Sequence, residues 1–227
     1  MEVILKLFVT KHGKYIMSQI KYLLGMDCET SGMTFSSQVD EMLPDPSAAP
    51  SKNGYYQSVS WGLIVCDLTT MQIVDKLYVE IKWDGEALWD KKAEKVHSLT
   101  KEYLEANGKT DEDAACDIYD FITKWWPDPK APISTMGHNI ASFDHWYFRR
   151  LMSKFNLMPT LGNRVIDTNT IGIVCYNAYT SNELYELVGV KRIQHNALED
   201  IKASWKVIKT TRSLFESYLT TDDTAEE

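Results

Sequence analysis

An apolar run that ends in two acids constrains the fold of this chain more than any other feature. Residues 22–29 read YLLGMDCE, with Asp27 and Glu29 at the end of the run. Side chains two residues apart on a strand leave the same face, so both carboxylates should point the same way. Ligands usually bind at the carboxyl ends of strands in α/β sheets, which favours a site here, although a solvated strand end could carry the same pair. The run therefore predicts a strand that presents two acids at a sheet edge.

Two further strand-like segments follow, and then the pattern becomes helical. Residues 58–68 are apolar, and residues 72–83 alternate after a turn at Thr69 and Thr70, which is typical of an antiparallel meander. Helix-like segments then alternate with short buried strands. We expect two short helices within 88–108, helices within 111–126, 142–155 and 197–219, and strands within 132–139 and 163–168. This order predicts an α/β fold with a mixed five-stranded sheet flanked by helices.

Composition limits the classes of protein that the chain can belong to. Its 227 residues, 44% of them hydrophobic, can bury one sizeable core. No apolar run approaches the roughly 20 residues that span a bilayer, so we expect a soluble, cytoplasmic protein with no membrane partner. The four cysteines lack zinc-ligand spacing, and Cys28, between the two acids, should face the core. The net charge of −8 argues against non-specific coating of long nucleic acid, so contacts with phosphates should be local and metal-assisted.

Two more acids and a histidine lie near the starts of expected helices. Asp144 should lie one turn into its helix and face the same sheet edge as the acidic pair. Asn196 and Glu199 suit a capping box for the last helix, which leaves His195 on the preceding loop and Asp200 in the first turns. A helix-start acid favoured by the macrodipole, or a solvated loop histidine, would explain each residue alone. Together with the acidic pair, they make a set of four carboxylates and one imidazole.

Such a set suits phosphodiester hydrolysis with two divalent ions. The reaction needs a nucleophilic water near neutral pH and relief of charge on the phosphate, and two ions about 3.5 to 4 Å apart supply both. Hard oxygen ligands select Mg²⁺ or Mn²⁺ over zinc. A neutral histidine, with an unperturbed pKa of about 6.5, can accept the proton of the water. The position of His195, five residues before Asp200, favours an exonuclease over a ribonuclease H-like endonuclease.

These residues resemble the motifs of the DEDDh branch of the DnaQ-like 3′-to-5′ exonucleases, which have a ribonuclease H-like fold. The DxE motif is matched by residues 27–29, HNxxxFD by residues 138–144 and HxxxxD by residues 195–200. Residues 96–104 resemble the family's HGIT segment, although Ser98 and Leu99 stand where the family often has Gly and Ile. The resemblance covers nearly the whole chain from about residue 21 to residue 219.

The resemblance implies a role for each matching residue. Four carboxylates would hold two Mg²⁺ or Mn²⁺ ions, and His195 would be the general base. Thr30 would lie near the terminal 3′ hydroxyl and His97 near the scissile end of the strand, although the departures at residues 98 and 99 put the role of His97 in doubt. The implied metal ligands are Asp27, Glu29, Asp144 and Asp200, and the implied substrate contacts are Thr30, His97, Asn139 and Phe143.

The predicted function is that of a metal-dependent 3′-to-5′ exonuclease that releases nucleoside 5′-monophosphates from single-stranded DNA or RNA. Two alternatives stay open: an oligoribonuclease-like enzyme that degrades short RNA, and a non-catalytic nucleic-acid or polymerase-binding module. A proofreading role would need a polymerase, replication or repair partner. Arg149, Arg150 and Lys154 follow Asp144 and could contact phosphates, although a solvated helix face is the default interpretation.

We expect the exonuclease domain to span residues 21–219. An N-terminal extension would occupy residues 1–20, and residues 220–227 would form an acidic tail. A loop insertion at about residues 32–57 is longer than the family's usual link between its first two strands. It could cover the site or contact substrate.

Overall fold

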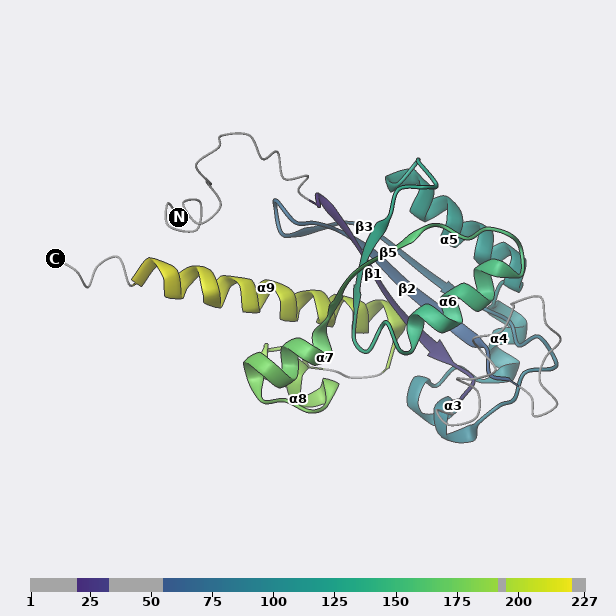
Figure 1. Cartoon of the computed structure of the whole chain (residues 1–227). Helices are drawn as coiled ribbons and strands as arrows, with labels where there is room; N and C mark the ends of the chain where they lie inside the picture. The colour runs from purple at the N-terminus through teal and green to yellow at the C-terminus, as the bar shows by residue number, and fades with distance from the viewer. Residues whose placement is uncertain (1–19, 33–54, 192–194, 222–227) are drawn as a thin grey trace.

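The computed structural model describes residues 20–32, 55–191 and 195–221, and the described chain forms a mixed sheet with helices on both faces (Figure 1). The five strands lie in the order β3-β2-β1-β4-β5. β1 is antiparallel to β2, which is antiparallel to β3, whereas β4 runs parallel to both β1 and β5. The strands are β1 (Tyr22–Thr30), β2 (Ser58–Asp67), β3 (Gln72–Glu80), β4 (Ile133–Gly137) and β5 (Leu161–Asp167). The expected meander and the five-stranded mixed sheet are both confirmed.

Strand position in the sheet explains the two sequence patterns. Every residue of β2 is buried because this strand has neighbours on both sides and helices on both faces, and its sequence is correspondingly apolar. β3 lies at the edge, and the burial of its side chains alternates over most of its length. The period of two that marked residues 72–83 therefore reflects one covered face and one solvated face.

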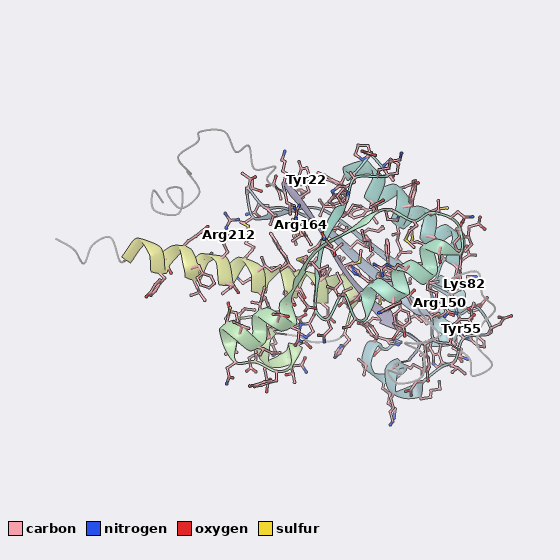
Figure 2. All side chains as sticks on the ribbon, in the orientation of Figure 1. Tyr22, Tyr55, Lys82, Arg150, Arg164 and Arg212 are labelled. Carbon is pink, nitrogen blue, oxygen red and sulfur yellow. The ribbon has the colours of Figure 1, made fainter. Side chains whose placement is uncertain are left out.

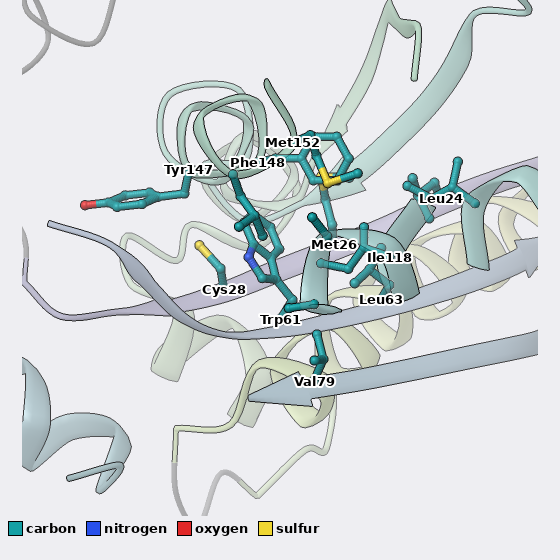
Figure 3. Packing of buried hydrophobic residues seen from close by; sticks show 14 of the residues in the cluster. Leu24, Met26, Cys28, Trp61, Leu63, Val79, Ile118, Tyr147, Phe148 and Met152 are labelled. Carbon is teal, nitrogen blue, oxygen red and sulfur yellow. The ribbon is translucent and has the colours of Figure 1, made fainter. Parts of the chain in front are cut away.

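The helices form two layers around this sheet. α5 (Asp111–Trp125) and α6 (Asp144–Ser153) cover one face, and the long α9 (Ala197–Thr221) packs on the other, against β1 and β2 (Figure 1). Two short helices, α3 (Lys91–His97) and α4 (Lys101–Asn107), follow β3. Figure 3 shows the largest core cluster, in which side chains from β1, β2, α5 and α6 meet; it includes Leu24, Met26, Cys28, Trp61, Leu63, Ile118, Phe148 and Met152.

Residues 168–187 contain three elements that we did not predict. They are α7 (Thr168–Ile171), a π-helical turn η1 (Gly172–Tyr176) and α8 (Ser181–Leu187). A capping box between Thr180 and Glu183 opens α8. Leu184 and Tyr185 of α8 then pack in a small cluster with Val207 of α9. These elements cover the side of α9.

α6 starts two residues later than expected, so the prediction that Asp144 lies one turn into this helix was wrong. Asp144 is the first residue of this helix, and the N-cap, Phe143, makes no side-chain capping bond. Residues before it form turns, because Asn139 takes a left-handed conformation (φ 57°) and its carbonyl accepts from Ser142. Asp144 is therefore held at the helix start itself.

Several sequence expectations lie largely outside the described residues: the extension at 1–20, most of the insertion at 32–57 and most of the tail at 220–227. Among the helices that the structure describes, none has the length and apolar character required to cross a membrane.

Candidate active site

The last side chains of β1 alternate between the hydrophobic core and the opposite face of the sheet. Cys28 is buried with only 6% of its surface exposed and belongs to the main core cluster. Asp27 and Glu29, on the opposite face, are half-buried. The expectation that Cys28 is a core thiol is confirmed, and burial raises its pKa well above the ordinary range. A neutral thiol in this position is a poor ligand for a metal.

Asp144 joins α6 to the same end of β1. Its Oδ1 accepts a hydrogen bond of 2.9 Å from the peptide nitrogen of Cys28. The parallel pairing of β1 with β4 is confined to Leu24 and Gly25, so this carboxylate satisfies a strand N–H beyond the point where β4 has separated. Burial raises the pKa of Asp144 to about 7, and the Cys28 N–H opposes that shift. A bound cation would favour the charged carboxylate instead.

The first turn of α9 carries the last acid of the set. The side chain of Asn196 accepts from the backbone nitrogens of Leu198 and Glu199, so the predicted N-cap role of Asn196 is confirmed. Glu199 forms an ion pair with Lys202 at 2.6 Å. Asp200 is buried with 3% of its surface exposed, and its backbone nitrogen donates to the Asn196 carbonyl. The cap therefore fixes the orientation of the turn that carries this carboxylate.

Two glycines on the acidic face of the sheet allow α9 to approach it closely. Gly62 of β2 is the partner of Asp27 in the β1–β2 register. A Cβ atom at Gly62 would lie 2.3 Å from the carbonyl carbon of Ala197 and from the nitrogen of Leu198. A Cβ atom at Gly25 would lie 3.0 Å from Cγ1 of Ile201. The start of α9 thus rests directly on the backbone of β2, beside the acidic pair.

This docking brings three of the predicted residues together. One ligand atom each from Glu29, His195 and Asp200 lies within 4.8 Å of the other two. His195 is half-buried, and its Nδ1 lies 3.9 Å from Oδ2 of Asp200. Asp27 and Asp144 are not part of this group of three; Asp27 is two residues from Glu29 on the same strand face, and Asp144 is bonded to the intervening peptide. Two carboxylates and an imidazole at this separation fit a divalent cation, with oxygen as the main donor.

His97 and Thr30 lie at the end of β1 next to this group. His97 is buried, and its Nδ1 accepts from the backbone nitrogen of Leu99 at 3.0 Å. Burial lowers the pKa of His97, against an opposing interaction with the backbone of Thr30. Thr30 is also buried, and its hydroxyl donates to the Gly32 carbonyl. Thr30 therefore ends β1 and His97 lies next to it, although both side chains are largely covered.

Asn139 and Phe143 lie in the turn that leads into α6. Asn139 is exposed, and its backbone nitrogen donates to Oδ1 of Asp167 at 3.0 Å. Phe143 is half-buried, with its ring centroid 5.0 Å from that of Tyr147. Each residue has a structural role in the turn, and Phe143 keeps part of its surface accessible.

Asp167 is a further acid at this edge that our site prediction omitted. It ends β5, accepts from the backbone nitrogens of Asn139 and Asn169, and its charge contributes to the raised pKa of Asp144. The sequence carried a signal for it, because Asp167 closes a strand parallel to β1 just as the acidic pair closes β1. From the sequence we predicted only a strand within residues 163–168 and no site residue there.

The fold is similar to that of solved structures of E. coli exonuclease I. The zinc-ion-bound form in complex with single-stranded DNA has a TM-score of 0.63 and 17% identity, over 89% of this chain and 43% of that one. The complex with a dT13 oligonucleotide has a TM-score of 0.63 and 17% identity, over 88% and 44%. An apo form has a TM-score of 0.61 and 17% identity, over 89% and 45%.

This likeness establishes the fold, which is the ribonuclease H-like arrangement of those structures. The chain spans less than half the length of the solved proteins that it matches. No family model matches the sequence, and no curated protein sequence matches it.

Proposed function

We propose that this chain is a metal-dependent 3′-to-5′ exonuclease that acts on single-stranded nucleic acid. The observation that supports it most is the group formed by Glu29, His195 and Asp200, three residues from the two ends of the chain, at the carboxyl edge of β1. The fold of this chain is similar to that of a protein solved with single-stranded DNA, which supports the same class of substrate. We place the catalytic domain at residues 21–219.

In this proposal four carboxylates hold two Mg²⁺ or Mn²⁺ ions, namely Asp27, Glu29, Asp144 and Asp200. The donor set fits these ions, because three of the four residues lie on or bond directly to the end of β1, and the fourth approaches to within ligand distance of Glu29. Such ions would lower the pKa of a bound water and stabilise negative charge on the phosphate.

The side chains of the site accept the proton, hold the proposed metal ligands in place and contact the substrate. His195, half-exposed and 3.9 Å from Asp200, accepts the proton of the attacking water, and the nearby carboxylate orients its imidazole and stabilises the imidazolium. The buried Asp200 and Asp144 are held by a helix cap and a strand N–H, so they need little reorganisation. Thr30 and His97 would bound the position of the terminal nucleotide, and Asn139 and Phe143 would contact the strand where it enters.

Hydrolysis of end-labelled oligonucleotides tests the proposal. Single-stranded and double-stranded DNA and RNA, each labelled at the 5′ end, are incubated with Mg²⁺, Mn²⁺ or EDTA, and the products are resolved by length. We expect a ladder that shortens from the 3′ end with either ion and no cleavage in EDTA. Activity confined to RNA dinucleotides would favour an oligoribonuclease-like enzyme. Binding of a 3′ end without hydrolysis in Mn²⁺ would contradict the proposal and favour a non-catalytic module.

A further inference from the structure

Arg150 of α6 carries a half-buried charge for which the described part of the chain offers no acceptor. Its Nε is buried and has no hydrogen-bond partner among the described residues. Within 20–32, 55–191 and 195–221, no carboxylate oxygen lies within 4.0 Å of its guanidinium. Arginine has five N–H donors and stays charged at any physiological pH. A partly buried group of this kind requires a hydrogen-bond acceptor, which an anion or a water molecule can supply.

The guanidinium is held in place by stacking rather than by an ion pair. Its central carbon lies 3.8 Å from the centroid of the Tyr55 ring. The hydroxyl of Tyr55 donates to Asp84, and Asp84 in turn accepts from the backbone nitrogens of Glu86 and Ala87. Stacking on a fixed aromatic ring leaves the in-plane N–H groups of an arginine free to bind a planar or tetrahedral oxyanion. The side chain is thus ordered before any ligand arrives.

The neighbouring cations of α6 lack this environment. Lys154 already forms an ion pair with Asp111, at 2.5 Å. Arg149 is exposed on the solvent side of the helix. Of the three cations that follow Asp144, Arg150 is the one that combines partial burial, a stacking platform and unused donors in the described structure.

The position of Arg150 relates it to the candidate active site. Tyr147, one turn earlier, donates to the carbonyl of Gly32, and Asp144, two turns earlier, bonds to Cys28 at the end of β1. Six residues of α-helix separate Arg150 from Asp144, a rise of about 9 Å. Figure 2 shows Arg150 and Tyr55 together at this end of the molecule. A separation of this size suits a phosphate farther along the same strand better than the phosphate that Asp144 helps to hold.

We propose that Arg150 binds a phosphodiester group of the substrate strand on the 5′ side of the scissile bond. This inference rests on the proposed function, since at a 3′ end every phosphate other than the scissile one lies toward the 5′ end. Its role is in binding the strand and not in the chemical step. Loss of the guanidinium should therefore raise KM for long strands and leave kcat unchanged.

Substrate length provides the decisive test. A dithymidine with a free 5′ hydroxyl contains only the scissile phosphate, whereas a decathymidine also offers phosphates to Arg150; diuridine and decauridine replace them if the wild type prefers RNA. Initial rates in Mn²⁺ are measured for the wild type, Arg150→Gln, Arg150→Lys and the matched control Arg149→Gln. Thermal unfolding of each protein shows whether it is folded.

We expect Arg150→Gln to raise KM for the decamer about tenfold and to change both constants for the dimer less than about twofold. The slope of log(kcat/KM) against log[salt] for the decamer should become shallower by about 0.7, the value for one contact to a single strand. Arg150→Lys keeps the charge, so its KM for the decamer should lie between those of the wild type and Arg150→Gln. Arg149→Gln should match the wild type.

Equal losses on dimer and decamer, or a loss that follows only the melting temperature, would overturn the inference and make Arg150 a structural residue. Activity of Arg150→Gln equal to the wild type on both substrates would overturn it as well. A wild type that hydrolyses neither substrate would instead overturn the proposed function, so the two failures are distinguishable.

Discussion

The two faces of β1 serve different purposes. Leu24, Met26 and Cys28 point into the core between the sheet and α5 and α6 (Figure 3). Gly25, Asp27 and Glu29 alternate with them on the other face, where a glycine admits α9 and the two acids stay half-buried. One strand therefore supplies both a stabilising surface and a chemical one. Substitutions on the two faces should have separable effects.

The largest effect on activity is expected on the acidic face. Glu29→Gln should reduce the hydrolysis rate at least about a hundredfold, because it weakens a proposed metal ligand. Even residues that only hydrogen-bond to metal ligands change metal affinity or activity by about 10- to 100-fold when they are replaced. The melting temperature should change little. Steady-state rates and thermal unfolding measure the two quantities. Glu199→Gln is the matched control, since this acid is exposed, pairs with Lys202 and does not belong to the group of three; an equal loss in the control would contradict the assignment.

The core face should behave in the opposite way. Met26 is fully buried, so Met26→Ala should lower the free energy of unfolding by about 2–5 kcal/mol through lost contacts and a residual cavity. The rate per folded molecule should be unchanged at low temperature. Urea unfolding followed by activity assays at about 10 °C checks both expectations. A hundredfold loss of rate in fully folded Met26→Ala would show that the two faces are not separable.

The two glycines test how closely α9 must dock. Gly62→Ala places a methyl group against the backbone of Ala197 and Leu198, which should cost about 1–3 kcal/mol by overpacking and displace the turn that carries Asp200. Because displacements near 1 Å can reduce rates about a hundredfold, activity should fall at least about tenfold. Gly25→Ala is the control: its methyl group meets only side-chain atoms, so stability should fall while the rate per folded molecule persists. Equal rates for both variants would show that docking at Gly62 does not position the site.

The buried His145 provides a pH test on the core side. Burial lowers its pKa from 6.5 to about 4, and its Nε2 lies 3.1 Å from the hydroxyl of Thr135. The unfolded chain binds a proton below pH 6.5 that the folded protein excludes, so this residue should cost about 2 kcal/mol of stability between pH 7.5 and pH 5. His145→Gln should remove that loss. Urea unfolding in EDTA at both pH values measures the stability of the wild type and of His145→Gln. The raised pKa of Asp144 makes stability change with pH in the opposite direction, but it does so in both proteins, so the difference between them reports His145 alone. Parallel pH profiles would contradict the prediction.

The sequence predicted the strands well and the short elements poorly. Alternation in residues 72–83 identified β3, and apolar runs identified β1, β2 and β4, because each of these strands covers one or both of its faces. β5, which is half-buried or exposed along its length, was expected within 163–168. α7, η1 and α8 span only four to seven residues each, which is too short for a helical period to emerge. Their stability comes from packing against α9, a contact that local sequence does not contain.

The candidate site was predictable as a set of residues but not as a geometry. Motif order placed Glu29, His195 and Asp200 together, and the structure brings these three within ligand distance. The close approach of Gly62 to Ala197, by contrast, joins segments that are far apart in the chain and needs coordinates. The same is true of Arg150, since its sequence spacing is that of any solvated helix face, whereas its stacking on Tyr55 follows from the fold.

The hydrogen bond between Asp144 and Cys28 has a practical consequence for preparing an inactive protein. Asp144 accepts from a strand nitrogen, so Asp144→Ala would leave a buried N–H without an acceptor, at a cost of about 1–3 kcal/mol. A protein inactivated at Asp144 would thus also be less stable, because the lost hydrogen bond lies where β1 and β4 separate. For trapping an uncleaved strand, the substitution of choice is at Glu29, which leaves the hydrogen bond from Cys28 to Asp144 in place.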